Sequence, residues 1–413
     1  MQKNDLRKDF MLFKKHPELV YLDSAATSQK PSYVLDWVKH FLENDYANIH
    51  RWLYSLSEKS EKLYIKSKKK LTKFINAQSW REIIYSFNST YAINLLVSSL
   101  KRSKYFKKWD KVLLSIVEHH ANIVPWLILK EEVGIEIDYI NLKDDFFLDF
   151  DDLKNKLDSN VVAISLTHVS NVTWRIFDLE KVNKILNKFS DSNKNSKKPL
   201  FIVDASQSIP HFKVDVQKIW CDFMFFTGHK IMANTWIWVL WWKKDLLNKL
   251  NPSFSWWWAI SSVKKDCFKL WALPDKFEPW TPNLSWAVSL LKALEYIENI
   301  WWYEKIIEID RELVNYTLKK FDKFKEVKLI WPSTNKWKIW VFSFTVKGIH
   351  SIDVADYMAE NNICIRAWQH CTEPFMSYLK IKNSCRMSLY IYNNKNDIDK
   401  FFEVLEKCIK SLS

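Results

Sequence analysis

The chain has 413 residues, of which 48% are hydrophobic and 27% charged, and its formal net charge is +14 at pH 7. This balance excludes an intrinsically disordered chain, and charges interrupt every apolar run before it reaches the roughly 20 residues that a membrane span needs. The first nine residues are rich in charge and contain no apolar segment, so we expect no secretion signal, no membrane association and a cytoplasmic location.

Glycine and tryptophan occur in abnormal numbers. The chain has 3 Gly and 23 Trp, whereas glycine alone makes up about 7% of an average globular protein. Many tryptophans stand at turns and strand ends, where positive φ or close backbone approach disfavours a bulky residue; these include Trp236, Trp238, Trp256 to Trp258, Trp280, Trp301 and Trp302. We hypothesise that UGA encodes glycine in the source organism and has been rendered as tryptophan. The alternative is a genuinely tryptophan-rich protein, with UGG codons at most of these positions.

The positive charge by itself does not indicate a nucleic-acid surface. The basic run between Lys66 and Lys70 lies in a segment with helical spacing of Leu63, Leu71 and Phe74, where a solvated lysine face is the commoner explanation. We therefore expect no nucleic-acid partner, although a basic binding scaffold without a cofactor remains the non-enzymatic alternative. The six cysteines include no C-x-x-C pair, so reduced thiols are expected.

Short β-rich runs alternate with helical patterns from about residue 80 to 245, which is typical of a mostly parallel sheet covered by helices. Strands are predicted over residues 83–87, 112–117, 161–166, 200–203, 223–226 and 237–240. Beyond about residue 290 an amphipathic helix over 306–321 precedes alternating apolar residues over 339–344. The pattern therefore predicts an α/β fold with a second, smaller α+β domain.

Polar side chains follow five of these predicted strands. In an open α/β sheet, ligands bind beyond the carboxyl ends of the strands. A small polar turn before a helix, an acid, an imidazole and a lysine at one edge are what pyridoxal phosphate requires. The segments that supply them are 88–90, 118–120, 167–171, 204–207 and 227–230.

A zinc hydrolase is the competing hypothesis for these histidines. Its ligands would come from His119, His120, His211 and His229. Their spacing matches no H-E-x-x-H pattern, so we expect no metal.

Six segments carry a family resemblance: Tyr21–Ala26, Glu118–Trp126, His168–Val172, Thr227–Lys230, Thr281–Asn283 and Arg366–Cys371. In this order they resemble the motifs of SufS-type (group II) cysteine desulfurases, which are class V aminotransferase members of the fold type I pyridoxal-phosphate enzymes. The match runs from about residue 20 to the C-terminus. Tryptophan replaces the family's glycine at positions 52, 109, 174, 236, 238, 280, 331 and 368, whereas the family also has tryptophan at Trp126.

The resemblance implies three regions and a shared site. An N-terminal arm would cover residues 1–22, a large cofactor-binding domain with a mostly parallel seven-stranded sheet would cover 23–290, and a small C-terminal α+β domain would cover 291–413. Thr281 is expected to reach the cofactor phosphate of a partner subunit, which implies a homodimer.

The resemblance also implies how pyridoxal 5'-phosphate would be held. Lys230 would be the Schiff-base lysine, Asp204 the partner of the pyridinium nitrogen, and His119 would stack on the ring. Gln207 would hydrogen-bond the phenolic oxygen, and Asn171 would touch cofactor or substrate. The remaining phosphate contacts would come from Ser89, Thr90, Thr227 and His229.

Cys371 matches the family's nucleophile. Its thiolate would attack the sulfur of a bound L-cysteine, leaving a persulfide on the enzyme and releasing L-alanine. Arg386 would hold the substrate carboxylate, with Arg366 as a second candidate, and His370 together with Arg366 would make the field around the thiol positive. The sulfur would pass to an acceptor protein of SufE or SufU type for iron–sulfur cluster assembly. Selenocysteine lyase or another class V activity is the alternative.

Overall fold

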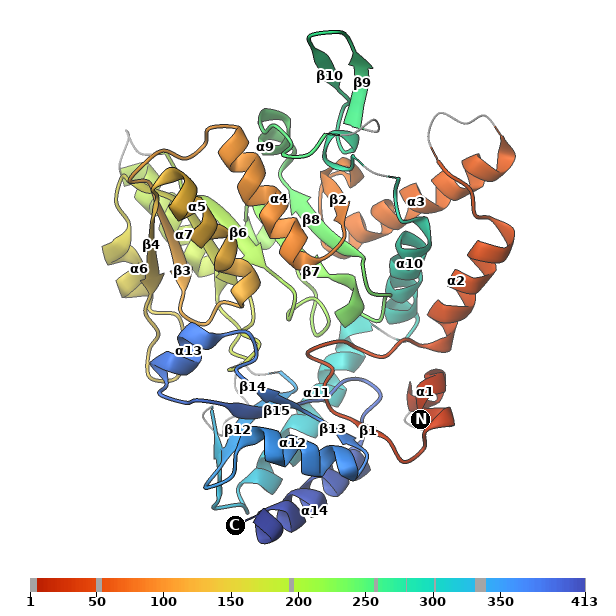
Figure 1. Cartoon of the computed structure of the whole chain (residues 1–413), viewed down its shortest axis with the longest axis vertical. Coiled ribbons are helices and arrows are strands. Elements are labelled where there is room, and N and C mark those ends of the chain that lie inside the picture. The colour runs from red at the N-terminus through yellow and green to blue at the C-terminus, as the bar shows by residue number, and fades with distance from the viewer. Residues whose placement is uncertain are drawn as a thin grey trace.

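A computed structural model describes residues 6–49, 54–192, 197–255, 259–279, 281–300, 302–330 and 339–412 (Figure 1). Its central sheet has seven strands in the order β2-β8-β7-β6-β5-β3-β4. Pairing is parallel from β4 to β7, whereas β8 runs antiparallel to both of its neighbours. The strands are β2 (Ile83–Ser86), β3 (Lys111–Ser115), β4 (Glu136–Ile140), β5 (Val161–Thr167), β6 (Leu200–Asp204), β7 (Phe223–Thr227) and β8 (Trp238–Trp242). The predicted fold class is confirmed.

Sequence periodicity missed the edge strand β4 and the hairpin of β9 (Ile260–Val263) and β10 (Phe268–Leu270). Only Ile140 of β4 is buried, and no residue of the hairpin is buried. Neither segment therefore carries the continuous apolar run that marked the buried strands. The hairpin projects from the body of the molecule (Figure 1).

Helices cover both faces of the large sheet because successive strand residues point to opposite sides. On β6, Ile202 packs in a cluster with residues of α4 (Ser89–Arg102) and α5 (Val124–Val133), whereas Phe201 and Val203 join the opposite core. That core also holds residues of α3 (Ser55–Phe74), α7 (Leu179–Ser192) and α10 (Leu284–Asn299). Across the described ranges, no helix has both the length and the apolar character needed to cross a bilayer.

Five further helices precede α10 in the described part of the chain. They are α1 (Met11–Lys15), α2 (Ser32–Asn44), α6 (Phe150–Lys156), α8 (Val216–Ile219) and α9 (Lys244–Lys249). Single 3-10 turns also occur, and two of them follow strands β3 and β7 as η3 (His120–Asn122) and η4 (Gly228–Lys230). These two turns matter for the site because they lie at the carboxyl ends of their strands.

A second sheet with the order β11-β12-β15-β14 forms the C-terminal part of the fold. Its strands β11 (Val327–Leu329), β12 (Val341–Val346), β14 (Arg366–Trp368) and β15 (Ser384–Ser388) pair antiparallel. The helices that follow or precede them are α11 (Trp302–Phe321), α12 (Ser351–Glu360), α13 (Glu373–Tyr378) and α14 (Lys395–Leu412). This α+β unit lies below the large sheet in Figure 1.

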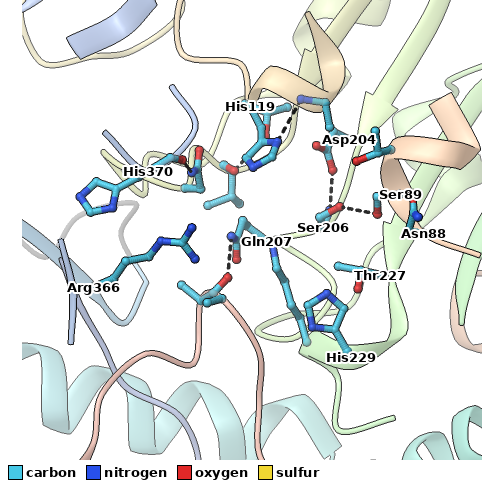
Figure 2. Close-up of a pocket in the computed structure, with 18 of the residues that line it drawn as sticks. Asn88, Ser89, His119, Asp204, Ser206, Gln207, Thr227, His229, Arg366 and His370 are labelled. Atoms are coloured by element: carbon cyan, nitrogen blue, oxygen red, sulfur yellow. Dashed lines mark hydrogen bonds between the residues drawn. The ribbon is translucent and has the colours of Figure 1, made fainter. Parts of the chain in front are cut away.

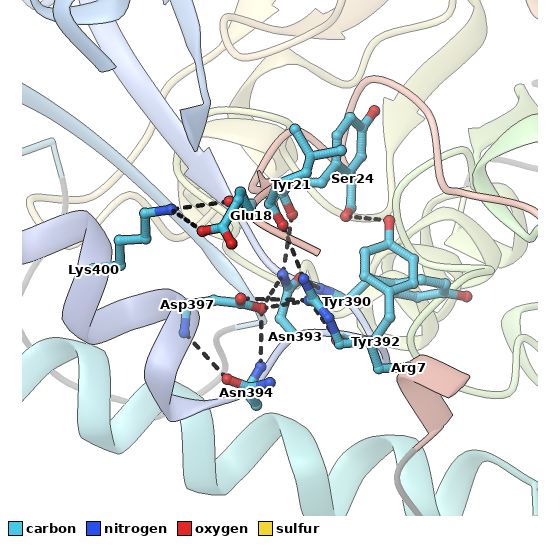
Figure 3. A network of polar contacts seen from close by, with 11 residues as sticks. Arg7, Glu18, Tyr21, Ser24, Tyr390, Tyr392, Asn393, Asn394, Asp397 and Lys400 are labelled. Atoms are coloured by element: carbon cyan, nitrogen blue, oxygen red, sulfur yellow. Dashed lines mark hydrogen bonds and ion pairs between the residues drawn. The ribbon is translucent and has the colours of Figure 1, made fainter. Parts of the chain in front are cut away.

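The N-terminal segment is joined to this C-terminal unit. Strand β1 (Val20–Tyr21) pairs in parallel with β13 (Ile363–Cys364). Arg7 binds Asp397 of α14 at 3.1 Å, and Ser24 Oγ lies 2.7 Å from the hydroxyl of Tyr392 (Figure 3). The segment that precedes helix α2 is therefore held by the C-terminal unit. The domain boundaries at residues 22 and 290 remain predictions.

Among the described residues, five tryptophans have left-handed backbone conformations: φ is 73° at Trp109, 58° at Trp174, 57° at Trp220, 69° at Trp236 and 96° at Trp368. All of these side chains except Trp174 are about half exposed or more. Positive φ suits glycine and is strained for a residue with a side chain, but Trp174 is fully buried, and the decoding hypothesis stays a prediction. Other suspected positions, at Trp52, Trp256 to Trp258, Trp280, Trp301 and Trp331, lie outside the described residues.

Candidate active site

A cavity of about 210 Å³ opens at the carboxyl ends of the central strands, between the large sheet and the C-terminal unit (Figure 2). Arg366 and His370 enter from one side, and Asp204, Ser206 and Thr227 from the other. All predicted site residues except Cys371 and Thr281 line this cavity: Ser89, Thr90, His119, Asn171, Asp204, Gln207, Thr227, His229, Lys230, Arg366 and Arg386.

One end of the cavity can hold an anion. Asn88 caps helix α4 by accepting the Tyr91 N–H at 2.6 Å, which leaves the first residues of the helix, Ser89 and Thr90, at the cavity wall. The hydroxyl of Thr227 is buried and has no hydrogen-bond partner among the described residues. A helix N-terminus facing an unpaired buried hydroxyl suits a phosphate group, because both supply donors to its oxygens.

Asp204 ends strand β6 in the middle of the cavity. Its Oδ1 accepts the N–H of Ser206 at 2.8 Å, and the Ser206 hydroxyl lies 3.5 Å from that of Ser89. Burial raises the pKa of Asp204, against the opposing effects of Ser206 and Lys230. A protonated ring nitrogen facing this carboxylate would offset the cost of its burial.

His119 lies in the turn after β3 and is held as a neutral ring. Its Nδ1 accepts the N–H of Ala121 at 3.1 Å, so the proton of the neutral imidazole is assigned to Nε2. Burial, followed by the nearby charge of Lys230, lowers the pKa of His119 to about 3. A neutral imidazole can stack on an aromatic cofactor ring without adding a charge to the cavity.

Lys230 ends the turn η4 after strand β7. Burial lowers the pKa of its amine to about 8; Arg386 and Arg366 act in the same direction, and Asp204 opposes them. A larger share of this amine is therefore neutral, and nucleophilic, than of an ordinary lysine amine near neutral pH.

Ser28 fixes the turn that carries Lys230. Its N–H and hydroxyl donate to the carbonyl of His229 at 3.1 and 3.0 Å, and its Oγ accepts the N–H of Met232 at 2.8 Å. Sequence reasoning missed this residue. Ser28 lies in a polar loop about 200 positions before the Lys230 turn, and nothing in that loop identifies its partner.

Two guanidinium groups face the cavity from the smaller sheet, where Arg366 and Arg386 are paired across β14 and β15. Arg386 is 3% exposed. It donates to the carbonyl of Asn171 at 3.3 Å and contacts Asp23 Oδ1 at 3.2 Å, while its Nε has no partner among the described residues. This arrangement can bind a carboxylate.

Cys371 is half-buried and lies in the loop beside the cavity rather than in its wall. It is close enough to raise the pKa of Arg386. The prediction that His370 adds positive charge near the thiol is wrong. This imidazole is buried, and its burial together with the two nearby arginines lowers its pKa well below the usual value, so the ring is neutral. The positive charge near the thiol therefore comes from the guanidinium groups.

Some residues considered in the sequence analysis lie away from the cavity, and two cavity residues were not predicted. Thr281 is exposed and lies outside the cavity wall. His211 packs against Trp174, Trp340 and Tyr390, and no group of three His, Cys, Asp or Glu side chains in the described ranges could hold a metal. Sequence reasoning did not assign the cavity residues Asn88 and Ser206, although both lie within the polar segments that it identified.

Comparisons with known proteins agree with this geometry. The class-V aminotransferase family model matches residues 20–401. A probable cysteine desulfurase of Synechocystis sp. is 34% identical, covering 99% of this chain and 96% of that protein. A cysteine desulfurase of Wigglesworthia glossinidia brevipalpis is also 34% identical, over 99% and 98% of the two chains.

Solved structures share the fold. The apo structure of a cysteine desulfurase from Thermococcus onnurineus NA1 superposes with a TM-score of 0.91 at 31% identity, covering 99% of this chain and 98% of that one. A C-DES mutant with glycine covalently linked to its pyridoxal-phosphate cofactor has a TM-score of 0.81 at 18% identity, over 97% and 98% of the two chains. The chain described here therefore belongs to the class-V aminotransferase family, among its cysteine desulfurases.

Proposed function

We propose that this protein is a pyridoxal-phosphate-dependent cysteine desulfurase of SufS type, which converts L-cysteine to L-alanine and carries the removed sulfur as a persulfide on Cys371. One observation carries the proposal. The amine of Lys230 and the carboxylate of Asp204 line the same cavity as the Arg386 guanidinium, with the Cys371 loop at its edge.

The residues present fit the cofactor. Bound pyridoxal phosphate would supply an electron sink for the substrate Cα. Lys230 would hold it covalently, Asp204 would keep its ring nitrogen protonated, and the neutral ring of His119 would stack on it. Gln207, whose amide donates to Ala25 O at 3.1 Å, would reach the phenolic oxygen. The phosphate would bind Ser89, Thr90, Thr227 and His229.

The substrate would be held from the smaller sheet. Arg386 would bind its carboxylate, with Arg366 as the second candidate and Asn171 at the same wall. The Cys371 thiolate would then attack the substrate sulfur. A sulfur–sulfur bond forms as the carbon–sulfur bond breaks, and the electron pair of the broken bond stays with the carbon fragment, which leaves as alanine once protonated.

The finer assignments concern partners and location. We place Thr281 at the phosphate of a partner subunit in a homodimer; its exposure outside the cavity supports this. The persulfide would pass to an acceptor of SufE or SufU type for iron–sulfur cluster assembly. All six cysteines are free, which supports a reducing compartment such as the cytoplasm.

The decoding hypothesis belongs to the same proposal. Tryptophan 368 lies three residues before the nucleophile with φ of 96°, a conformation that glycine adopts without strain. We propose that this position, and those of Trp109, Trp174, Trp220 and Trp236, are glycine in the natural protein.

The test is detection of alanine and sulfide from L-cysteine with the wild-type protein, Lys230→Ala and Cys371→Ser. We expect turnover only with the wild type. Turnover by Lys230→Ala equal to the wild type would overturn the proposal. A Cys371→Ser variant that is inactive on cysteine but active on selenocysteine would favour selenocysteine lyase as a second activity of the same site.

A further inference from the structure

The loop that carries Cys371 has a strained backbone. It connects β14 to α13, and φ is positive at two residues that the decoding hypothesis leaves unchanged, His370 and Cys371, with values of 54° and 58°. A left-handed conformation costs a residue other than glycine about 1–2 kcal/mol. Such strain persists only where the surroundings fix it, so the contacts that hold this loop determine where the thiol lies.

Three hydrogen bonds join the loop to the segments that follow strands β3 and β5 of the large sheet. Asn171 Nδ2 donates to the carbonyl of His370 at 2.7 Å, and the main-chain N–H of His120 donates to the carbonyl of Cys371 at 2.8 Å. The third bond runs the other way, because His120 Nε2 accepts the N–H of Glu373 at 2.9 Å. His120 thus contacts the chain on both sides of Thr372.

The imidazole of His120 caps helix α13, because it accepts an N–H at the N-terminus of that helix. Glu373 is the first residue of α13, and Thr372, at the N-cap position, makes no side-chain capping bond. Helix N-termini leave their first N–H groups without intrahelical partners. Here a side chain from the opposite unit satisfies one of them. The loop's end is therefore anchored to the large unit, in addition to the bonds that the N–H and hydroxyl of Thr372 donate to Gln369 O within the loop.

The turn that carries His120 is itself rigid. The buried carboxylate of Glu118 accepts the N–H of Thr167 at 2.9 Å and the side-chain amide of Asn122 at 2.7 Å, and Asn122 accepts the hydroxyl of Ser165 at 2.6 Å. Both flanking positions of the turn are therefore fixed to β5. The same turn presents His119 to the cavity.

We propose that His120 is a positioning residue for the nucleophile: its imidazole anchors the start of α13 and thereby holds the Cys371 loop against the turn that presents His119. The nucleophilic role of Cys371 rests on the proposed function, but the anchoring itself does not. One rigid turn would then set both the cofactor-facing imidazole and the position of the thiol.

The test compares His120→Ala, His120→Asn and His120→Gln in the cofactor-loaded protein. The main-chain bond to Cys371 survives in all three, so they isolate the imidazole. A glutamine amide oxygen reaches about as far as Nε2 and can accept the Glu373 N–H, whereas an asparagine oxygen is too short. His40→Ala, on the exposed part of α2, is the matched control.

We expect the alanine and asparagine variants to lose about tenfold in kcat, the equivalent of one hydrogen bond of about 1.4 kcal/mol, with KM for L-cysteine and the cofactor absorbance unchanged. Alkylation of Cys371 by iodoacetamide, followed by peptide mass spectrometry, should become several-fold faster because the loop is released. Glutamine should restore both values.

Equal alkylation rates in all variants would overturn the proposal, and so would loss of the cofactor absorbance in His120→Ala, since that would place the role of His120 at the cofactor. If the wild type forms no alanine from cysteine, the proposed function fails, while the alkylation rates still decide the anchoring.

Discussion

Asp23 and Arg386 form an ion pair between the N-terminal segment and the smaller sheet, with Oδ1 and Nη2 3.2 Å apart. Asp23 also bridges to Ser388 of strand β15, two residues beyond the arginine on the same strand. The pair therefore orients a buried guanidinium at the cavity wall, although the two residues are 363 positions apart in the sequence. Aiming the group in advance reduces the entropy lost when a substrate binds.

Arg386→Lys should weaken substrate binding. A lysine ammonium cannot reproduce the planar two-pronged contact with a carboxylate while also contacting Asp23 and the carbonyl of Asn171. We expect KM for L-cysteine to rise about tenfold or more, with a smaller change in kcat, in steady-state kinetics. Arg366→Lys is the control. If that variant raises KM more than Arg386→Lys, the main carboxylate contact belongs to Arg366.

Covalent uptake of pyridoxal phosphate by the apoprotein should depend on pH through Lys230. Burial lowers the pKa of this amine to about 8, and only the neutral amine is nucleophilic. The uptake rate should therefore rise about tenfold per pH unit below 8 and level off above it, whereas an ordinary lysine with a pKa of about 10.4 would keep rising. Stopped-flow absorbance between pH 6 and 10 measures this.

A variant of Asp204 tests whether the pH dependence of cofactor uptake comes from Lys230. Because Asp204 raises the pKa of Lys230, Asp204→Asn should move the inflection to lower pH. A rate that still climbs at pH 10 in the wild-type protein would contradict the assignment of Lys230 as the buried amine of this site.

Ser206→Ala should weaken cofactor binding. The Ser206 hydroxyl lies in the cavity, 3.5 Å from that of Ser89, whereas the N–H that binds Asp204 is retained in alanine. Removing one hydrogen bond of about 1 kcal/mol should raise the Kd for pyridoxal phosphate about fivefold. Ser208 is buried nearby and donates to the carbonyl of Ala205 at 3.1 Å without lining the cavity. A Ser208→Ala variant with an equal increase in Kd would show that the effect is structural.

The sequence predicted the central strands well because each is buried on both faces and forms a continuous apolar run. The polar residues after them could be assigned to one edge from the rule that parallel strands end together. Contacts between distant segments could not be predicted this way. The clamp of Ser28 on the Lys230 turn, the Asp23–Arg386 pair and the contact of His120 with Glu373 depend on how separate elements pack. The neutral state of His370 depends on its burial, which local sequence does not reveal.

Peptide mass spectrometry of the protein purified from its natural source should find glycine at the five tryptophan positions with positive φ. Trp126 is the internal control: it is fully buried in helix α5 and packs against Phe106, so it should remain tryptophan. Tryptophan masses at all five positions would end the decoding hypothesis.

Trp368→Gly in a recombinant protein tests the consequence for function. The substitution removes a half-exposed indole beside the nucleophile loop and relieves a φ of 96°, so the variant should gain about 1 kcal/mol in unfolding free energy. Its desulfurase rate should exceed that of the tryptophan form, because the loop must admit substrate. Trp37→Gly, in the interior of helix α2, is the matched control and should instead lose stability, since glycine is unfavourable within a helix. Equal desulfurase rates for Trp368→Gly and the tryptophan form would show that position 368 tolerates an indole.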